Sequence, residues 1–346
     1  MKYTTLPNTE IKVSKICLGT MTFGQQNTEA EGHEQMNYAL EKGVNFFDTA
    51  EMYSVPAREE TYGSTEKILG TWFKKTGRRE EVVLASKIAG PNPNFTYMRD
   101  KNDFSPTSIK YALDNSLQRL QTDYIDLYQL HWPERKTNFF GQRGFKVQED
   151  DAWEDNVHAV LDTLGDFIKE GKIKHIGLSN ETPWGIMRFL EESKHHNLPR
   201  IKTVQNPYSL LNRLFESGSA EISLRENVGL LAYSPMAFGI LSGKFLSGEK
   251  HPNARINLFP QFSRYNSAQC TEATRLYQEI AHKNGLSLTE LSLAFIEQQP
   301  FVTSTIIGAT TMEQLKENID TIQVSLSDEI LKAIDEVQAI IPDPAP

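Results

Sequence analysis

The strongest constraint on the fold is a regular alternation of short apolar runs with amphipathic helical stretches, repeated eight times along the chain. The apolar runs have the length and composition of buried strands. They occupy residues 15–20, 43–49, 81–87, 124–131, 173–180, 201–206, 228–235 and 303–309. Eight strand–helix units favour an α/β fold in the form of a closed (β/α)8 barrel, or TIM barrel, over a doubly wound sheet. We expect residues 1–346 to form this one barrel domain, since no linker-like composition divides them.

Two of the helical stretches have recognisable ends. Ser105 and Pro106 are residue types that favour the N-cap and the first position of a helix, and apolar side chains then recur at helical spacing. Another helical pattern begins at Val157, and Gly171 is expected to end it.

Four segments fall outside the regular alternation. Residues 1–14 are predicted to form an N-terminal β-hairpin that closes the N-terminal end of the barrel. The connections 88–105, 132–152 and 234–270 are longer than ordinary crossovers, and loops of such length commonly cover a functional site. We therefore expect long loops after the strands, over the C-terminal mouth of the barrel.

Charge and composition exclude several classes of protein. The net charge of -9 and the pI near 5.5 argue against a general nucleic-acid or anionic-membrane binder. No apolar run has the length of a signal-peptide core or a membrane span. Cys17 and Cys270 lie far apart and are expected to be reduced thiols of a cytoplasmic protein. The predicted outer helices 64–76 and 271–284 carry no conspicuous apolar stripe, which favours a monomer.

Most of the predicted strands end in polar residues or glycine. These residues are Gly19, Thr20, Asp48, Lys87, His131, Ser179, Asn180, Gln205, Tyr233, Ser234 and Gly308. In a (β/α)8 barrel all such positions face one mouth, where the active sites of this fold lie. Asp48, Lys87 and His131 follow three consecutive strands, and Tyr53 lies just beyond Asp48. A turn cap, a solvated strand end or a core histidine explains each residue alone, but burying the whole ionisable set without a purpose is costly.

The chemistry of these four side chains fits protonation of a carbonyl oxygen. A phenol with a pKa of about 10 is a weak acid at neutral pH, and a nearby ammonium lowers the cost of its ionisation. We therefore assign Tyr53 as general acid, Lys87 as the group that tunes it and Asp48 as the anchor of Lys87. A neutral His131 then orients the substrate oxygen. The set contains no nucleophile for carbon, so hydride must come from a cofactor.

Competing chemistries explain fewer of these residues. A Schiff base at Lys87 leaves Asp48 and Tyr53 without a shared role. No metal site is expected, because the sequence has no HExxH or CxxC pattern and His195 and His196 lie in a polar helix-end stretch. There is no GxGxxG and no P-loop, so a dinucleotide must bind without a Rossmann fold.

Segments spread in order over nearly the whole chain resemble the aldo-keto reductases. They read ICLGTMTFG, FDTAEMYS, ASK, YIDLYQLHWP, IGLSN, QNPYSLLNR, LLAYSPMAFGILSGK and IIGATTMEQLKENI. The flanking stretches AEMYSVP and HWPERKTNFFG are most similar to the Tas-type bacterial members. The resemblance implies that Asp48, Tyr53, Lys87 and His131 form a catalytic tetrad. It also implies a cofactor, usually NADPH, bound in extended form across the barrel mouth.

The resemblance assigns cofactor contacts residue by residue. The nicotinamide ribose end would be lined by Gly19, Thr20, Met21 and Asp48. The nicotinamide itself would contact Ser179, Asn180, Gln205 and, by stacking, Tyr233. The pyrophosphate would be wrapped by Ser234, Pro235, Met236, Ala237, Gly239, Leu241, Gly243 and Lys244. The adenosine end would contact Gly308, Thr310, Gln314, Glu317 and Asn318.

The adenosine end departs from the pattern of many relatives. Thr310 is expected to bind the 2′-phosphate and to cap the following helix, whose Gln314, Glu317 and Asn318 share one face. Many relatives carry an arginine on this helix, but here only Lys316 is present. Lys244 and Arg255 must supply the positive charge, so strict selectivity for NADPH is less firmly founded than binding.

Two functional hypotheses follow from the sequence. The first is an NADPH-dependent reductase of aldehyde and ketone carbonyls whose substrate contacts Tyr53, His131 and Trp132. Aromatic residues including Phe23, Phe139 and Phe140 are expected to wall an apolar substrate pocket. The second hypothesis is a non-catalytic, nucleotide-sensing interaction protein, because some proteins with this fold are channel-associated subunits. The four intact ionisable positions favour the enzyme.

Overall fold

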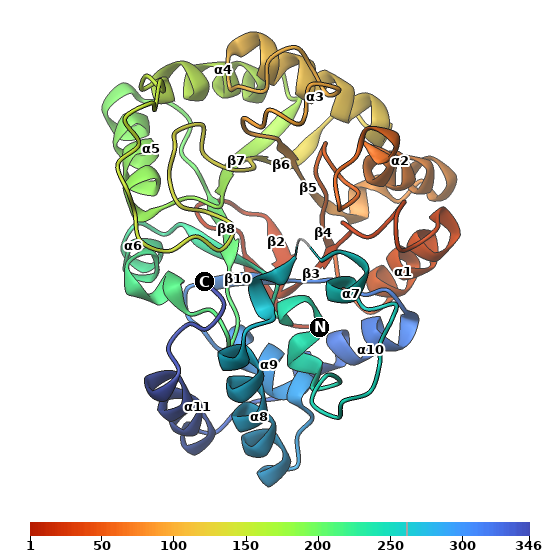
Figure 1. Cartoon of the computed structure of the whole chain (residues 1–346). Helices are drawn as coiled ribbons and strands as arrows, with labels where there is room; N and C mark the ends of the chain where they lie inside the picture. The colour runs from red at the N-terminus through yellow and green to blue at the C-terminus, as the bar shows by residue number, and fades with distance from the viewer. Residues whose placement is uncertain (261) are drawn as a thin grey trace.

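Eight parallel strands close into a barrel with the helices on its outer side (Figure 1). The computed structural model describes residues 1–260 and 262–346; residue 261, in the predicted connection 234–270, lies outside the described residues. Around the barrel the strands follow the order β10-β3-β4-β5-β6-β7-β8-β9. Their bounds are Ile16–Gly19 (β3), Phe46–Asp48 (β4), Val83–Ile88 (β5), Ile125–Leu130 (β6), Ile173–Ser179 (β7), Thr203–Pro207 (β8), Gly229–Tyr233 (β9) and Val302–Ile307 (β10). The predicted (β/α)8 barrel is confirmed.

The register of the strands brings their polar ends to one level. Gly19 of β3 pairs with Asp48 of β4, and Lys87 of β5 pairs with Gln129 of β6. Further round the barrel, Ser179 of β7 pairs with Gln205 of β8. The residues singled out at the strand ends therefore meet at the same mouth, as expected for parallel strands.

The helices cover the barrel from outside. They are Glu29–Glu41 (α1), Ser64–Thr76 (α2), Pro106–Leu120 (α3), Val157–Lys169 (α4), Pro183–His196 (α5), Ser219–Arg225 (α6), Arg255–Leu258 (α7), Ala268–Lys283 (α8), Leu288–Glu297 (α9), Met312–Asp320 (α10) and Asp328–Ile340 (α11). Ser105 caps α3 by accepting a hydrogen bond from the Ser108 backbone N–H, and Pro106 occupies its first position. Gly171, with φ +74°, ends the turn after α4. The predicted ends of both helices are confirmed.

An N-terminal hairpin closes one end of the barrel, as predicted. Its strands Tyr3–Thr5 (β1) and Lys12–Ser14 (β2) pair in antiparallel fashion. Val13 is fully buried and packs in one apolar cluster with Cys17, Phe46 and Leu127 of the barrel strands. The hairpin therefore fills space that water would otherwise occupy beneath the barrel core.

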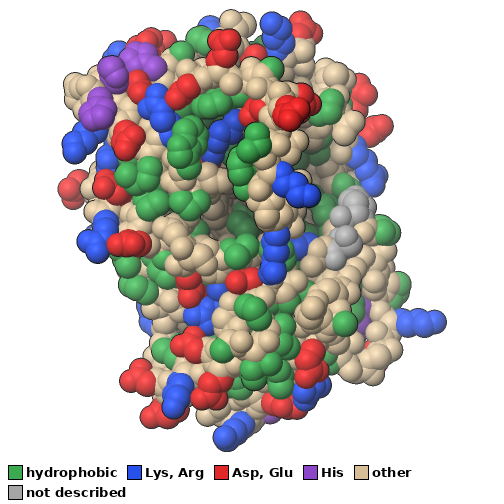
Figure 2. Space-filling model, turned by 60° about the vertical axis from the view of Figure 1, so that its left-hand side comes forward, with side chains coloured by type: hydrophobic (Ala, Val, Ile, Leu, Met, Phe, Trp, Pro, Cys, Tyr) green, Lys and Arg blue, Asp and Glu red, His purple; other side chains and the backbone are tan. Residues whose placement is uncertain are grey.

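Long connections follow several of the strands. Residues 89–105 and 131–156 contain no helix or strand, whereas 234–270 contains short 3-10 turns, α7 and the first turn of α8 among its described residues. Figure 1 shows the connection after β6 lying across the strands. Acidic and basic side chains are interspersed over the face drawn in Figure 2. Cys17 and Cys270 are buried free thiols, and no helix in the described ranges is long and apolar enough to span a membrane.

Replacing Val13 with alanine should lower the free energy of unfolding by about 2 kcal/mol, because two buried carbon atoms are lost and a cavity remains. Val147→Ala is the matched control, since that side chain is 80% exposed. Chemical denaturation of both variants and the wild type provides the measurement. Equal stabilities of the Val13→Ala protein and the wild type would contradict the role of the hairpin as a plug.

Candidate active site

A fully buried ammonium lies at the centre of the barrel mouth. Lys87, near the end of β5, is 0% exposed. Its Nζ donates hydrogen bonds to Asp48 Oδ2 at 2.7 Å and to the Thr49 carbonyl at 2.8 Å. The Tyr53 hydroxyl lies 3.5 Å from the same nitrogen. One cation thus joins the carboxylate at the end of β4 to the phenol five residues later.

The second oxygen of Asp48 is held from the opposite side of the barrel. Gln205 Nε2 donates to Asp48 Oδ1 at 2.8 Å, and Gln129 Nε2 lies 3.4 Å from the same atom. With both oxygens occupied, the carboxylate has one orientation and keeps Lys87 in place. Sequence reasoning missed Gln129; the signal was an amide two residues before His131, inside a strand whose neighbouring residues are Tyr128 and Leu130.

His131 completes the group. Its ring and that of Tyr53 meet edge to face with centroids 5.7 Å apart. Burial, together with the nearby charge of Lys87, holds the pKa of His131 well below its usual value. The imidazole is therefore neutral at physiological pH and can donate one hydrogen bond while accepting another. Its Nδ1 is buried without a hydrogen-bond partner among the described residues.

The protonation states of Tyr53 and Lys87 follow from burial and mutual attraction. Burial raises the pKa of Tyr53 above its usual value, against the opposing effect of Lys87. Burial alone would lower the pKa of Lys87, but Asp48 and Tyr53 raise it above the usual value. At neutral pH the phenol therefore carries its proton and the amine its charge. Lys87 does favour the ionised phenol, as expected from sequence, but burial outweighs this effect.

A second buried ion pair supports the segment that carries Tyr53. Glu51 lies between Asp48 and Tyr53 in the chain, and its Oε1 accepts from the Ala89 N–H and from Arg99 Nη1, both at 2.7 Å. Arg99 Nη2 also donates to the Ala89 carbonyl at 2.8 Å. This pair ties the tyrosine segment to the end of β5 and to the following loop. Sequence reasoning missed both residues, although Glu51 stands out as an acid within FDTAEMY.

Aromatic side chains line one side of the mouth. Trp132 packs beside His131 with ring centroids 5.0 Å apart, and its Nε1 donates to the Pro91 carbonyl at 3.1 Å. Phe140 meets the same indole at 5.9 Å and stacks edge to face on Phe139. The structure therefore brings Trp132 and the phenylalanine pair together beside His131.

Phe23 does not line this side of the mouth, so the expectation that it walls the pocket is wrong. Its side chain is 0% exposed and belongs to the main core between barrel and helices. The ring lies against α1 so closely that a Cβ at Gly32 would come within 3.0 Å of it. The glycine in α1 makes room for the ring in the core, away from the aromatic cluster around Trp132.

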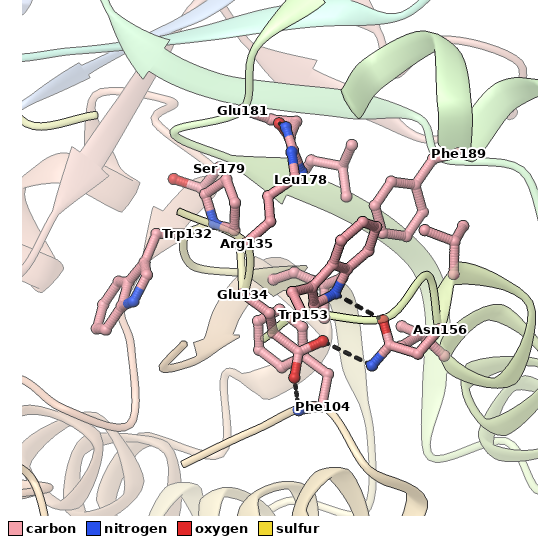
Figure 3. A pocket seen from close by; sticks show the side chains of 14 residues that line it. Phe104, Trp132, Glu134, Arg135, Trp153, Asn156, Leu178, Ser179, Glu181 and Phe189 are labelled. Atoms are coloured by element: carbon pink, nitrogen blue, oxygen red, sulfur yellow. Dashed lines mark hydrogen bonds and ion pairs between the residues drawn. The ribbon is translucent and has the colours of Figure 1, made fainter. Parts of the chain in front are cut away.

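A small pocket lies beside the loop that carries Trp132, and Glu134 and Arg135 of this loop help to line it (Figure 3). Glu134 accepts hydrogen bonds there from the Phe104 N–H at 2.7 Å and from Asn156 Nδ2 at 2.8 Å. Burial raises the pKa of Glu134. Arg135 forms a salt bridge with Glu181 and donates to Thr182 at the start of α5. These contacts anchor the loop beside Trp132, and sequence reasoning did not single them out.

Comparison with known proteins agrees with this geometry. Residues 15–339 match the model of the aldo/keto reductase family. The chain is 48% identical to Protein tas of Escherichia coli over the full length of both proteins. It is 34% identical to an uncharacterized oxidoreductase, YrpG, of Bacillus subtilis, covering 97% of this chain and 96% of that protein. It is also 28% identical to the Schizosaccharomyces pombe aldo-keto reductase yakc, over 92% and 86% of the two chains.

This chain belongs to the aldo/keto reductase family. It is therefore an oxidoreductase, and its similarity to Tas proteins extends over its whole length. The family resemblance expected from the sequence is confirmed.

In this aldo/keto reductase, the polar residues expected near the nicotinamide form one connected group. Tyr233 Oη donates to Asn180 Oδ1 at 2.6 Å, and Asn180 Nδ2 donates to the His131 carbonyl at 2.9 Å. Ser179 Oγ donates to the Gln205 carbonyl at 2.9 Å. Side chains from β7, β8 and β9 therefore lie beside the buried ammonium and its partners.

Gly19 and Thr20 have structural roles in the barrel. A Cβ at Gly19 would lie 2.7 Å from the Ile306 side chain and 2.9 Å from the Ile307 carbonyl, so glycine permits close packing of β3 on β10. Thr20 is fully buried and donates to the Asp48 carbonyl at 2.8 Å.

The segment after β9 has an unusual backbone. Left-handed φ values occur at Ser234 (+54°), Ala237 (+47°), Phe238 (+54°), Gly239 (+92°) and Gly243 (+76°). Three consecutive left-handed residues, 237–239, curl the chain tightly, and the N–H groups of Ala237 and Gly239 donate to the Ser234 and Met236 carbonyls at 2.9 and 2.8 Å. Pro235, Ala237, Leu241 and Gly243 are buried here, whereas Met236 and Lys244 are partly exposed.

The start of α10 corrects one expectation. The N-cap is Thr311, whose side chain accepts from the Gln314 N–H, and not Thr310. Thr310 instead donates its N–H and hydroxyl to Gln314 Oε1 at 2.9 and 3.1 Å. Asn318 is buried with its Nδ2 3.4 Å from the Gly308 carbonyl, whereas Glu317 is exposed.

Two cations stand near the left-handed segment. Arg255 lies 3.3 Å from Gln26 Oε1 and 3.6 Å from Met21 Sδ, and its guanidinium faces the Phe238 ring at 5.2 Å. Burial lowers the pKa of Arg255 to about 10 and also lowers that of Lys244. Across the described ranges, neither cation forms an ion pair with a carboxylate. Arg255 therefore remains charged at neutral pH.

Removing Arg99 should destabilise the protein by about 3 kcal/mol or more, because Glu51 would be left as a buried charge without its partner. Arg78→Ala is the control: its pair with Glu81 is exposed, so the loss should stay below about 1 kcal/mol. Urea unfolding of Arg99→Ala, Arg78→Ala and the wild type measures the loss of stability in each variant. Equal losses in both variants would show that the Glu51 pair does not support the site.

Proposed function

We propose that this protein is an NADPH-dependent reductase of aldehyde and ketone carbonyls, with Tyr53 as the proton donor. The observation that carries the proposal is the position of Lys87 Nζ, 2.7 Å from Asp48 Oδ2 and 3.5 Å from Tyr53 Oη at the centre of a barrel mouth. A buried phenol beside a fixed ammonium is suited to give up its proton as negative charge develops on a bound oxygen.

The roles of the other groups follow from the same geometry. Asp48 keeps Lys87 charged and fixed, and Gln205 fixes Asp48. Neutral His131, edge to face with Tyr53, donates a hydrogen bond to the carbonyl oxygen and holds it beside the phenol. Trp132, Phe139 and Phe140 exclude water from the apolar part of the substrate.

The residues at the mouth fit a phosphorylated dinucleotide. The left-handed segment from Ser234 to Gly239 curves beside Lys244 and Arg255, which bring positive charge without an acidic partner among the described residues. When bound, the cofactor supplies hydride to the carbonyl carbon. Tyr233 and Asn180, joined by a hydrogen bond of 2.6 Å, would hold its nicotinamide end, and Thr310 and Gln314 would hold its adenosine end. The name of the yakc relative specifies NADP(+), which supports this choice.

The wider assignment is part of the same proposal. Residues 1–346 act as one barrel domain, as a monomer, on a small carbonyl compound, with no nucleic-acid or membrane partner. A cytoplasmic location is supported by two buried free thiols, Cys17 and Cys270.

Tyr53→Phe should lower the rate of carbonyl reduction by about 10² or more, because the ring remains and only the transferable proton is lost. Cofactor affinity should persist. Loss of absorbance of the reduced nicotinamide, followed with a panel of aldehydes and quinones, measures the rate, and fluorescence titration measures the affinity. Tyr62→Phe is the control, since that hydroxyl lies 3.4 Å from Arg119 instead of contacting Lys87.

Two outcomes would contradict this assignment in different ways. Wild-type turnover by Tyr53→Phe would exclude Tyr53 as the acid. Cofactor binding without turnover of any substrate in the panel, by the wild type, would favour the nucleotide-sensing interaction protein instead.

NADPH should bind more tightly than NADH by a factor of tens, because one charged hydrogen bond to the 2′-phosphate is worth about 1.5–3 kcal/mol. Lys244→Ala should reduce the difference in affinity between the two cofactors, mainly by weakening the binding of NADPH. Added salt should reduce this difference as well. Fluorescence titrations of both cofactors at two ionic strengths test this. Lys250→Ala, an exposed lysine of the same connection, is the control. Equal dissociation constants of NADPH and NADH at low salt would exclude the proposed contact with the 2′-phosphate. The barrel and the roles of the four buried groups would not be affected by that result.

A further inference from the structure

A cluster of metal-ligand side chains lies on the outer surface of the barrel, between α4 and α5. It consists of His158, Glu192 and His196, whose ligand atoms all lie within 4.8 Å of one another. His158 Nδ1 lies 2.6 Å from Glu192 Oε1, and His196 Nε2 lies 3.4 Å from the same oxygen. Figure 2 shows histidine side chains gathered near the upper left edge of the view. None of these residues takes part in the proposed reaction.

The two helices bring the three groups together. Glu192 and His196 are four residues apart on α5 and therefore share one face. His158, the second residue of α4, reaches across from the neighbouring helix. The two imidazole rings meet edge to face with centroids 4.9 Å apart. Three ligand groups from two helices therefore converge on one point. An ordinary pair four residues apart on one helix would not bring in a third group from a neighbouring helix.

The donor set suits zinc. Two neutral imidazoles and one carboxylate are common ligands of Zn²⁺, with a solvent molecule as the fourth. Bonds of about 2 Å in a tetrahedron place ligand atoms about 3.3 Å apart. The His196–Glu192 separation of 3.4 Å already matches this spacing. His158 would have to withdraw by about 0.7 Å to reach it, and side chains that are 56% and 52% exposed have room to move.

Arg188 prepares the carboxylate for this role. Its Nη1 donates to Glu192 Oε2 at 2.6 Å, while its Nε donates to Asp155 Oδ2 at 2.6 Å. The guanidinium therefore fixes one oxygen of Glu192 and leaves Oε1 facing both imidazoles. In metal sites generally, residues that hydrogen-bond to the ligands fix the orientation of those ligands. The positive charge of Arg188 also weakens attraction for a cation, so the affinity should be moderate.

We infer that His158, Glu192 and His196 form a surface site for one Zn²⁺ ion that joins the start of α4 to α5. The start of α4 directly follows the connection 131–156, which carries Trp132. A bound ion would therefore fix the outer end of that connection, away from the barrel mouth.

Isothermal titration of the untagged protein with Zn²⁺ tests the site. The wild type should bind one ion with a dissociation constant on the order of micromolar, and His158→Ala and His196→Ala should each weaken binding at least tenfold. His195→Ala is the matched control, because it removes an exposed histidine adjacent in the chain that is not part of the cluster. Mg²⁺, which prefers oxygen ligands, should not bind there.

Thermal unfolding with and without Zn²⁺ gives a second readout. The ion should raise the midpoint of the wild type and of His195→Ala, but not that of His196→Ala, whose fold is checked by circular dichroism. Absence of zinc binding by the wild type, or equal affinity of His196→Ala and wild type, would overturn the inference. Equal weakening by His195→Ala would overturn it too, since binding would then belong to exposed histidines in general.

Discussion

The structure of the mouth depends on the burial of one ammonium group. Transfer of a lysine charge out of water costs several kcal/mol, and it is tolerated only where charge and hydrogen bonds replace the solvent. Lys87 is 0% exposed and receives this compensation from Asp48 Oδ2 and the Thr49 carbonyl, with Tyr53 as a third neighbour. The position of the Tyr53 phenol therefore depends on its contact with the Lys87 ammonium as well as on its own packing.

The same requirement extends outward in two directions. Asp48 can balance Lys87 in one orientation only because Gln205 holds its second oxygen. The segment from Asp48 to Tyr53 is tied to the end of β5 by Glu51 and Arg99, together with the Glu51 N–H that donates to the Lys87 carbonyl at 3.1 Å. Barrel closure makes both possible, since it brings β4, β5 and β8 around one axis. A sheet with open edges would leave Gln205 far from Asp48.

Sequence reasoning was sufficient for features that repeat or that end a strand, and insufficient for long-range side-chain contacts. The strands, the hairpin and the cap at Ser105 follow from local patterns, which fix backbone structure over a few residues. The proximity of Asp48, Lys87 and His131 follows from barrel geometry once the strands are known. The Glu51–Arg99 pair does not, because Arg99 lies in an irregular loop 48 residues away. Phe23 was assigned wrongly because an aromatic residue near a mouth and one in the adjacent core look alike in sequence.

At the start of α10, too, the sequence could not show which of two adjacent residues makes a given side-chain contact. Thr310 and Thr311 are adjacent and chemically identical, and the cap falls to Thr311 because its extended backbone (φ -134°, ψ 159°) points its hydroxyl at the Gln314 N–H. Thr310 is left to bond the Gln314 side chain, so its hydroxyl is held outside the helix and next to Asn27, which donates to its carbonyl at 3.0 Å. Arg255 bonds Gln26, the neighbour of Asn27. Residues 26 and 27 thus link Arg255 to the start of α10. This link brings the cation of α7 toward the start of α10, whose one basic residue is Lys316, so Arg255 adds a second positive charge at this end.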